Sequence, residues 1–159
     1  MLEITVIHVG NTKESYYKEA LSEYEKRLSA YCNFTSKEIK EQPLGDDPSK
    51  GQIDAALEKE ADAVLAAVPQ RALIISLCVE GKKLSSEGLA EYIERSLSEY
   101  SKICFVIGSS YGLSERVKKA SALRLSFSDM TFPHRLMRVM LSEQIYRAFT
   151  INFGKTYHK

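Results

Sequence analysis

Two short segments in the second half of the chain contain residue types that suit a ligand site. In Val106 to Leu113, Gly108 and Gly112 follow an apolar run, so the backbone there can approach a ligand closely, although the G-x-G-x-x-G spacing of a dinucleotide site is absent. Phe127 to Phe132 is too apolar for an ordinary solvated loop. Its aromatic and methyl groups, with free backbone amides, would suit a purine and a thioether. A tight turn and a buried connection are the alternative interpretations.

The first of these segments also matches G-x-S-x-G, the pattern of a serine nucleophile, with Ser110 at its centre. Asp129 and then His134 or His158 follow in the order of a hydrolase triad. A nucleophile elbow needs a helix directly behind the serine, whereas the apparent cap Ser114 places the next helix several residues later. A serine hydrolase is therefore an alternative that the spacing disfavours.

Histidine and arginine side chains gather at the start of the final predicted helix. His134 and Arg138 are four residues apart and so share a helix face, with Arg135 nearby, a group suited to contact with phosphate. The chain ends in Tyr157-His158-Lys159, which could stack on and contact RNA, although chain ends usually fray. The formal net charge of +1 gives no global field that would hold a nucleic acid. Any RNA contact must therefore use such a local patch.

The elements that position these residues are predicted by apolar periodicity and by cap residues. Strands are expected at Leu2 to Val9, Phe34 to Ile39, Ala72 to Val79, Ile103 to Ile107 and Ala122 to Phe127. Helices are expected at Lys13 to Tyr31, at Ile53 to Val68, from Ser85 or Ser86, from Ser114, and from Pro133 to about Phe149, with Pro133 as the first helical residue. Gln42 to Gly51 is expected to be a mobile loop.

Two of the predicted strands, Ala72 to Val79 and Ile103 to Ile107, are apolar on both faces, which is typical of a parallel sheet covered by helices on each side. The alternation of strands and helices predicts one α/β domain over residues 1–159 with a mostly parallel, five-stranded sheet. In such sheets a ligand binds beyond the carboxyl ends of the strands. We therefore expect the site at the loops after Val79, Ile107 and Phe127.

Composition supports one ordinary globular domain, with 44% hydrophobic and 27% charged residues in 159. The three cysteines, Cys32, Cys78 and Cys104, have no metal-ligand spacing, and we interpret them as buried thiols in a reducing compartment. The first residues lack the features of a secretory signal, and no apolar run approaches the roughly 20 residues that span a bilayer. The sequence predicts a cytoplasmic protein without a membrane segment.

The final predicted helix is apolar over a wider face than contact with one sheet requires. Beside its main apolar stripe it carries Leu136, Val139 and Met140. We therefore expect this helix to pack on a second subunit as well.

Taken along its whole length, the chain resembles the SPOUT-superfamily methyltransferases that act on N3 of a pseudouridine in 23S ribosomal RNA. The most specific matching stretch is Leu125 to His134 (LSFSDMTFPH), continued at Glu143 to Ala148 and at Tyr157 to Lys159. Shorter matches occur at Val9-Gly10, Glu23 to Leu28, Leu84 to Ala90 and Phe105 to Gly108.

The resemblance implies S-adenosyl-L-methionine as cofactor, the large-subunit rRNA of the assembled 70S ribosome as substrate, an obligate homodimer, and a trefoil knot in the C-terminal half. No metal is implied. The cofactor residues carried over by motif are Leu77, Gly108, Phe127, Ser128, Asp129, Met130, Thr131 and Phe132. The catalytic and substrate-side residues are His134, Arg138, Tyr157 and His158.

Two positions depart from the family pattern: Ser109 stands where a second glycine is usual, and Cys78 where an acidic residue is usual. Methyl transfer requires mainly that the acceptor nitrogen be aligned and water excluded. A base must also take the N3 proton, and either His134 or His158 could do so, with Arg138 stabilising negative charge on the base. A non-catalytic ribosome-binding factor is a third interpretation, which would need no small-molecule pocket.

Overall fold

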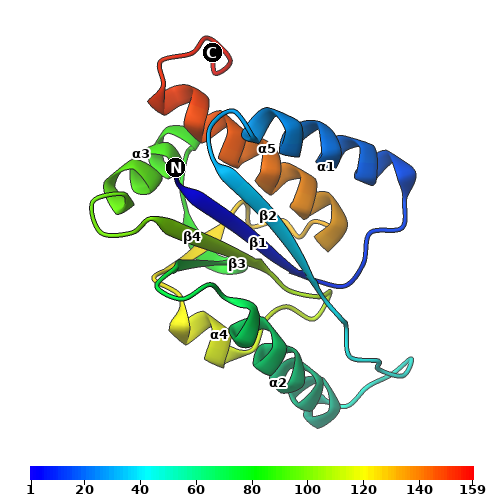
Figure 1. The fold of residues 1–159 in the computed structure, drawn as a ribbon. Helices are drawn as coiled ribbons and strands as arrows, with labels where there is room; N and C mark the ends of the chain where they lie inside the picture. Colours follow the sequence, from blue (N-terminus) through cyan, green and yellow to red (C-terminus); the bar gives the residue numbers. More distant parts are fainter.

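A computed structural model describes residues 1–159 and shows a single five-stranded sheet (Figure 1). The strands are β1 (Glu3–Val9), β2 (Asn33–Ile39), β3 (Leu73–Lys83), β4 (Lys102–Ile107) and β5 (Leu123–Ser126). Their order across the sheet is β2-β1-β4-β3-β5, and every neighbouring pair is parallel. The predicted α/β class with a mostly parallel sheet is confirmed. The trefoil knot stays a prediction.

Five helices cover both faces of the sheet. They are α1 (Ser15–Leu28), α2 (Lys50–Ala67), α3 (Ser86–Ser96), α4 (Glu115–Ala120) and α5 (His134–Asn152). Figure 1 shows α1, α3 and α5 on one side and α2 and α4 on the other. Each side has its own apolar core, because successive side chains of the buried strands point to opposite faces. In β4, for example, Phe105 packs in the first core and Val106 in the second.

Side-chain caps set the start of three helices. Ser49 forms a capping box with Gln52 before α2, and the Ser85 and Ser114 hydroxyls accept backbone N–H groups at the starts of α3 and α4. These caps confirm the predicted helix starts at Ser85 and Ser114. Helix α2 begins at Lys50, inside the segment predicted to be a loop, because its cap Ser49 lies four residues before the first apolar position, Ile53. Helix α5 begins one residue later than predicted, with Pro133 at its N-cap position.

Strand β3 is longer than the predicted strand and is interrupted. It runs to Lys83, and both Leu77 and Lys82 align with Leu125 of β5, so the four residues 78–81 are left out of the ladder. Gly81 is required there, because a Cβ atom at this position would lie 2.7 Å from the carbonyl carbon and oxygen of Arg124. Leu77 is therefore the last residue before a bulge, within a strand that was predicted to end at Val79 and that runs to Lys83.

The cysteines differ in their surroundings. Cys32 and Cys104 are buried as predicted, and burial raises the pKa of each thiol to about 12. Cys78 is only partly buried, because it lies in the bulge of β3, so its predicted burial was wrong. No helix of the structure has the length and apolar character needed to cross a membrane.

Candidate functional site

A cavity of about 650 Å³ opens beyond the carboxyl ends of β3, β4 and β5, and we call it the carboxyl-edge pocket. Three segments that follow these strands form most of its wall, as expected for a parallel sheet. The pocket is lined by Leu77–Glu80, Ile107–Leu113, Lys118, Leu125–Ser128, Met130–His134 and Met137. Of the residues predicted to bind a cofactor, it brings together Leu77, Gly108 and all of Phe127 to Phe132 except Asp129.

Asp129 does not line the pocket. Its Oδ2 atom lies 2.6 Å from Nζ of Lys83, and both side chains are largely exposed. The loop is held from inside instead, because the Ser128 hydroxyl accepts the Met130 N–H at 3.0 Å while its carbonyl accepts the Ser126 hydroxyl at 3.0 Å. Asp129 therefore has an ion-pair partner outside the pocket that its motif position did not suggest.

Gly108 is needed by the loop itself. A Cβ atom at this position would lie 2.3 Å from the carbonyl oxygen of Gly112, closer than real Cβ atoms come to any neighbour. Gly112 has φ of +88°, a conformation that favours glycine. The sequence predicted that Gly108 lets a ligand approach the backbone closely. In the structure, the atom that excludes a side chain at Gly108 is the carbonyl oxygen of Gly112, within the same turn.

Behind this turn lies a buried carboxylate that the sequence analysis did not select. Glu60 of α2 is 4% exposed, and its Oε2 accepts the Gln42 N–H at 2.9 Å. Its other oxygen has no hydrogen-bond partner, although the neighbouring Ser109 side chain lowers the pKa of the carboxyl. Burial prevails and raises that pKa above its ordinary value. Glu60 thus ties the segment after β2 to helix α2 through the Gln42 N–H.

His134 lines the pocket from the start of α5, and its Nε2 atom is buried without a hydrogen-bond partner. A Cβ atom on Gly10 would lie 3.6 Å from this nitrogen, which places His134 beside the end of β1. His8 of β1 lies in the same region, and its Nδ1 donates to the Gly10 carbonyl at 2.9 Å. Burial, with Arg138 and His134 nearby, lowers the pKa of His8 to about 4. His8 is therefore neutral at physiological pH.

Arg138 lies outside the pocket lining, between α5, the loop after β1, and β2. Its guanidinium donates to Thr12 Oγ1 at 3.0 Å and to Ser36 Oγ at 2.8 Å. Burial lowers its pKa, an effect that the negative charges of Glu25 and Glu38 offset only in part, and no carboxylate lies within ion-pair distance. Arg135, by contrast, pairs with Glu14 at 2.8 Å. Arg138 is thus a desolvated cation held only by neutral hydroxyls.

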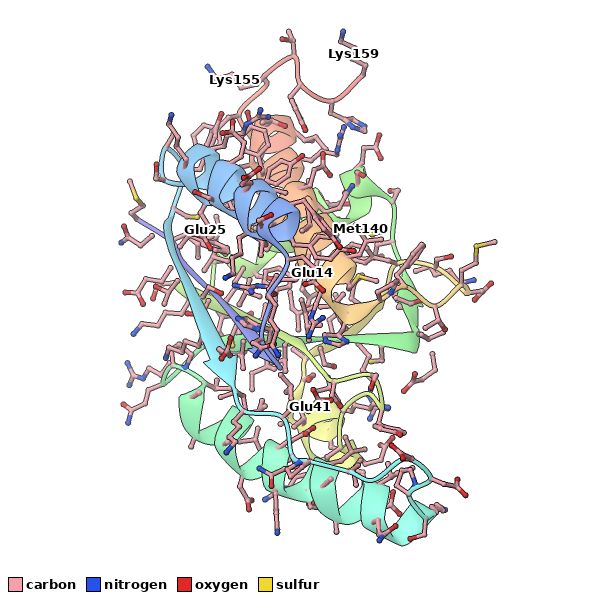
Figure 2. The ribbon with its side chains drawn as sticks, turned by 90° about the vertical axis from the view of Figure 1, so that its right-hand side faces the viewer. Glu14, Glu25, Glu41, Met140, Lys155 and Lys159 are labelled. Carbon is pink, nitrogen blue, oxygen red and sulfur yellow. The ribbon has the colours of Figure 1, made fainter.

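The C-terminal tail folds onto its own chain. The Tyr157 hydroxyl donates to Glu143 Oε1 at 3.0 Å, and the His158 ring nitrogens lie 2.7 Å from Glu87 and 3.1 Å from Arg147. Figure 2 shows Lys155 and Lys159 at the end of α5 that is remote from Glu41 and the strand ends. Of the four residues predicted to be catalytic, only His134 lines the carboxyl-edge pocket.

A second cavity of about 540 Å³, which we call the apolar groove, connects these two regions. It shares Leu125, Phe127 and Phe132 with the carboxyl-edge pocket. It continues past Val139 and Met140 of α5 to Glu143, the residue that binds the tail. The wide apolar face predicted for the final helix therefore lies partly open along this groove.

The geometry does not support the hydrolase alternative. Ser110 is exposed in the loop, and α4 begins at Glu115, so no helix starts directly behind the serine. Asp129 pairs with Lys83, and His158 with Glu87. No triad geometry is formed.

Comparison with known proteins gives a consistent result. The sequence model of a family described as "Predicted SPOUT methyltransferase" matches residues 2–158. A "Ribosomal RNA large subunit methyltransferase H" of Clostridium botulinum strain Alaska E43 is 45% identical over 159 residues, covering 99% of this chain and 100% of that protein. A protein of the same name from strain Eklund 17B of that species has the same identity and coverage.

Proposed function

The chain belongs to the SPOUT methyltransferase family, and on that premise we propose that it transfers a methyl group from S-adenosyl-L-methionine to N3 of a pseudouridine in 23S rRNA. The observation that carries this proposal is the carboxyl-edge pocket, which a ribosome-binding factor without catalysis would not need. On the same basis we propose the assembled 70S ribosome as the substrate and the cytoplasm as the location.

The pocket fits the proposed methyl donor. Phe127, Met130 and Phe132 offer apolar and aromatic surface for a purine and a thioether, while the turn from Gly108 to Gly112 offers polar backbone. Its volume of about 650 Å³ lies within the range of small-molecule sites. The donor would supply an activated methyl group on a sulfonium.

The chain's own residues would orient the acceptor and move its proton. His134 lines the pocket wall and its Nε2 atom has no hydrogen-bond partner, so rotation of the ring toward the pocket would let it accept the N3 proton. His158 is the other candidate for the base. It lies in the C-terminal tail, outside the carboxyl-edge pocket, so the tail would have to reach such a pocket for His158 to act. Arg138, which lacks a carboxylate partner, would bind the negatively charged backbone or the base oxygens of the RNA.

A methylation assay tests this function directly. Purified protein, S-adenosylmethionine carrying a labelled methyl group, and 70S ribosomes or isolated 50S particles from cells lacking the enzyme should give one labelled pseudouridine in 23S rRNA. Mass spectrometry of the digested RNA would identify the modified nucleoside. Absence of label on every ribosomal substrate, with a folded protein, would contradict the proposal.

We expect the active form to be a homodimer through α5 and the apolar groove. Leu136, Val139 and Met140 are only partly buried in the single chain, and covering them would remove apolar surface from water. Light scattering at micromolar concentration should give about twice the chain mass of 17.9 kDa. A mass of one chain at that concentration would contradict the shared interface. The Val139→Glu variant should be more monomeric than the wild-type protein, because it places a charge in the apolar groove.

A further inference from the structure

The bulge in β3 turns a polar side chain into the carboxyl-edge pocket. Residues 78–81 leave the β3–β5 ladder, and three of them, Cys78, Val79 and Glu80, line the pocket. Bulges next to ligand sites commonly redirect side chains in this way. Gly81 then returns the chain to the ladder at a point where no side chain fits against Arg124.

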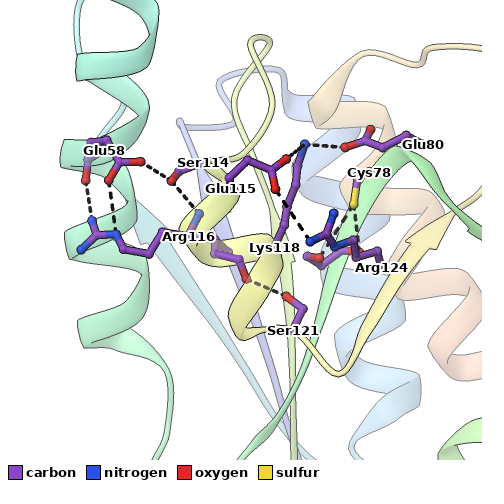
Figure 3. Close-up of polar contacts among 11 residues, drawn as sticks. Glu58, Cys78, Glu80, Ser114, Glu115, Arg116, Lys118, Ser121 and Arg124 are labelled. Atoms are coloured by element: carbon purple, nitrogen blue, oxygen red, sulfur yellow. Dashed lines mark hydrogen bonds and ion pairs between the residues drawn. The ribbon is translucent and has the colours of Figure 1, made fainter.

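Glu80 is the only carboxylate in the pocket lining, and Lys118 of α4 is its only lysine or arginine. The two form an ion pair, which Figure 3 shows beside Cys78 and Arg124. Lys118 also lies 3.8 Å from Glu115, which does not line the pocket. The Lys118 side chain is 15% exposed, so it is held in place, whereas Glu80 at 56% remains accessible to a ligand.

The ion pair with Lys118 determines which chemical group of a ligand can bind to the Glu80 carboxylate. An ammonium group would compete with Lys118 for the carboxylate, and a ligand carboxylate would compete with Glu80 for the lysine. A neutral hydroxyl brings no second positive charge beside Lys118, and it needs only one of the lone pairs that the ion pair leaves free on the carboxylate. The bond from Lys118 lowers the pKa of Glu80, so the side chain acts only as an acceptor at neutral pH. The Cys78 thiol beside it, whose pKa burial raises, is only a weak hydrogen-bonding group.

We propose that Glu80 accepts hydrogen bonds from the ribose hydroxyls of the methyl donor, with Lys118 holding the carboxylate in position. A carboxylate that binds vicinal ribose hydroxyls is a recurrent solution in nucleotide sites. The assignment rests on the proposed function, since it requires a nucleoside in this pocket. In this assignment Glu80 recognises the nucleoside half of the cofactor and not its amino-acid end.

Calorimetric titration of the full-length protein with two ligands tests the assignment. S-adenosylhomocysteine carries both the adenosine and the amino-acid end, whereas 5′-methylthioadenosine keeps the adenosine, with its ribose hydroxyls, and lacks the amino-acid end. Glu80→Gln should weaken binding of both by a similar factor of at least about tenfold, as expected for loss of a charged hydrogen bond. Glu115→Gln, which removes the other carboxylate near Lys118, is the matched control and should change neither affinity by more than about twofold.

The possible outcomes separate the two proposals. Unchanged affinities in Glu80→Gln, or a loss confined to S-adenosylhomocysteine, would overturn the ribose assignment while leaving the methyltransferase function standing. Failure of the wild-type protein to bind either ligand would overturn both. A further measurement needs no variant: the 3′-deoxy and 2′-deoxy forms of methylthioadenosine should bind the wild-type protein more weakly, at least one of them by about tenfold. Equal binding of all three ligands would also contradict the assignment.

Discussion

Replacing Arg138 with methionine should reduce methyl transfer to ribosomes at least about a hundredfold, roughly 2.7 kcal/mol of barrier, while leaving the folded protein about as stable as before. The reason for the loss is the state of the guanidinium. It is partly desolvated, its direct hydrogen-bond partners are two neutral hydroxyls, and the carboxylates of Glu25 and Glu38 act on it only from beyond ion-pair distance. Such a cation is available to an RNA anion.

The partial burial of the Arg138 charge also explains why the Arg138→Met variant should be about as stable as the wild-type protein. A half-buried cation without an ion-pair partner costs desolvation free energy that two hydrogen bonds to neutral hydroxyls offset only in part. Arg138→Met keeps most of the apolar stem and removes the charge, while Thr12 and Ser36 each lose one donor. These effects oppose each other, so the free energy of unfolding should change by no more than about 1 kcal/mol.

Arg135 provides the matched control, because it is one turn away on the same helix. Its guanidinium is already committed to Glu14 and to the Asn11 carbonyl. Arg135→Met should therefore lower the melting temperature more than Arg138→Met and reduce methyl transfer less. Thermal unfolding and single-turnover transfer on 70S ribosomes measure the two effects. If Arg138→Met retained transfer, or if Arg135→Met lost more of it, Arg138 would not be the substrate-side cation.

The fold could be predicted from the sequence because its signals are local. Strand residues such as Ile103 to Ile107 are apolar on both faces, which favours a parallel sheet with two helical layers. The caps at Ser85 and Ser114 follow from the side-chain type alone. The bulge of β3 could not be predicted in this way, because it depends on how β3 aligns with a strand about 40 residues later.

The candidate site was predictable to the extent that it is made of loops at the carboxyl edge of the sheet. The features that were missed are buried polar side chains and ion pairs between residues distant in the sequence. His8 and Glu60 lie within a predicted strand and helix, where a histidine or glutamate gives no signal of burial. Asp129 illustrates the opposite case, since its motif position suggested a cofactor contact while its partner Lys83 is 46 residues away.

The position of the tail has a consequence for catalysis. In the single chain, His158 is tied to Glu87 and Arg147, outside the carboxyl-edge pocket of the same chain. The apolar groove leads from Phe127 and Phe132 at that pocket to Glu143 beneath the tail. If a second subunit covers this groove, its tail would approach the pocket of the first. We therefore expect the tail to act on the partner's substrate.

Deleting Tyr157 to Lys159 should reduce methyl transfer at least about tenfold, roughly 1.4 kcal/mol of barrier, while cofactor affinity and dimer mass stay nearly unchanged. The deletion removes the Tyr157 ring from its contacts with Tyr146, at 4.9 Å between centroids, and with Arg147. Tyr157 itself belongs to neither buried core, so little stability should be lost. His158→Ala should reproduce much of the loss of transfer, whereas Lys155→Ala should not.

Mixed dimers determine which subunit the tail serves. One subunit lacks residues 157–159, and the other carries Ser110→Trp, chosen to fill the carboxyl-edge pocket and checked by calorimetry for loss of cofactor binding. If the tail acts across the interface, the intact pocket of the shortened subunit receives the intact tail of its partner, and transfer returns to about half the wild-type rate per dimer. If it acts within one chain, the only intact pocket has no tail and the mixed dimer stays inactive. Full activity in the homodimer of shortened chains would remove the tail from catalysis altogether and leave His134 as the base.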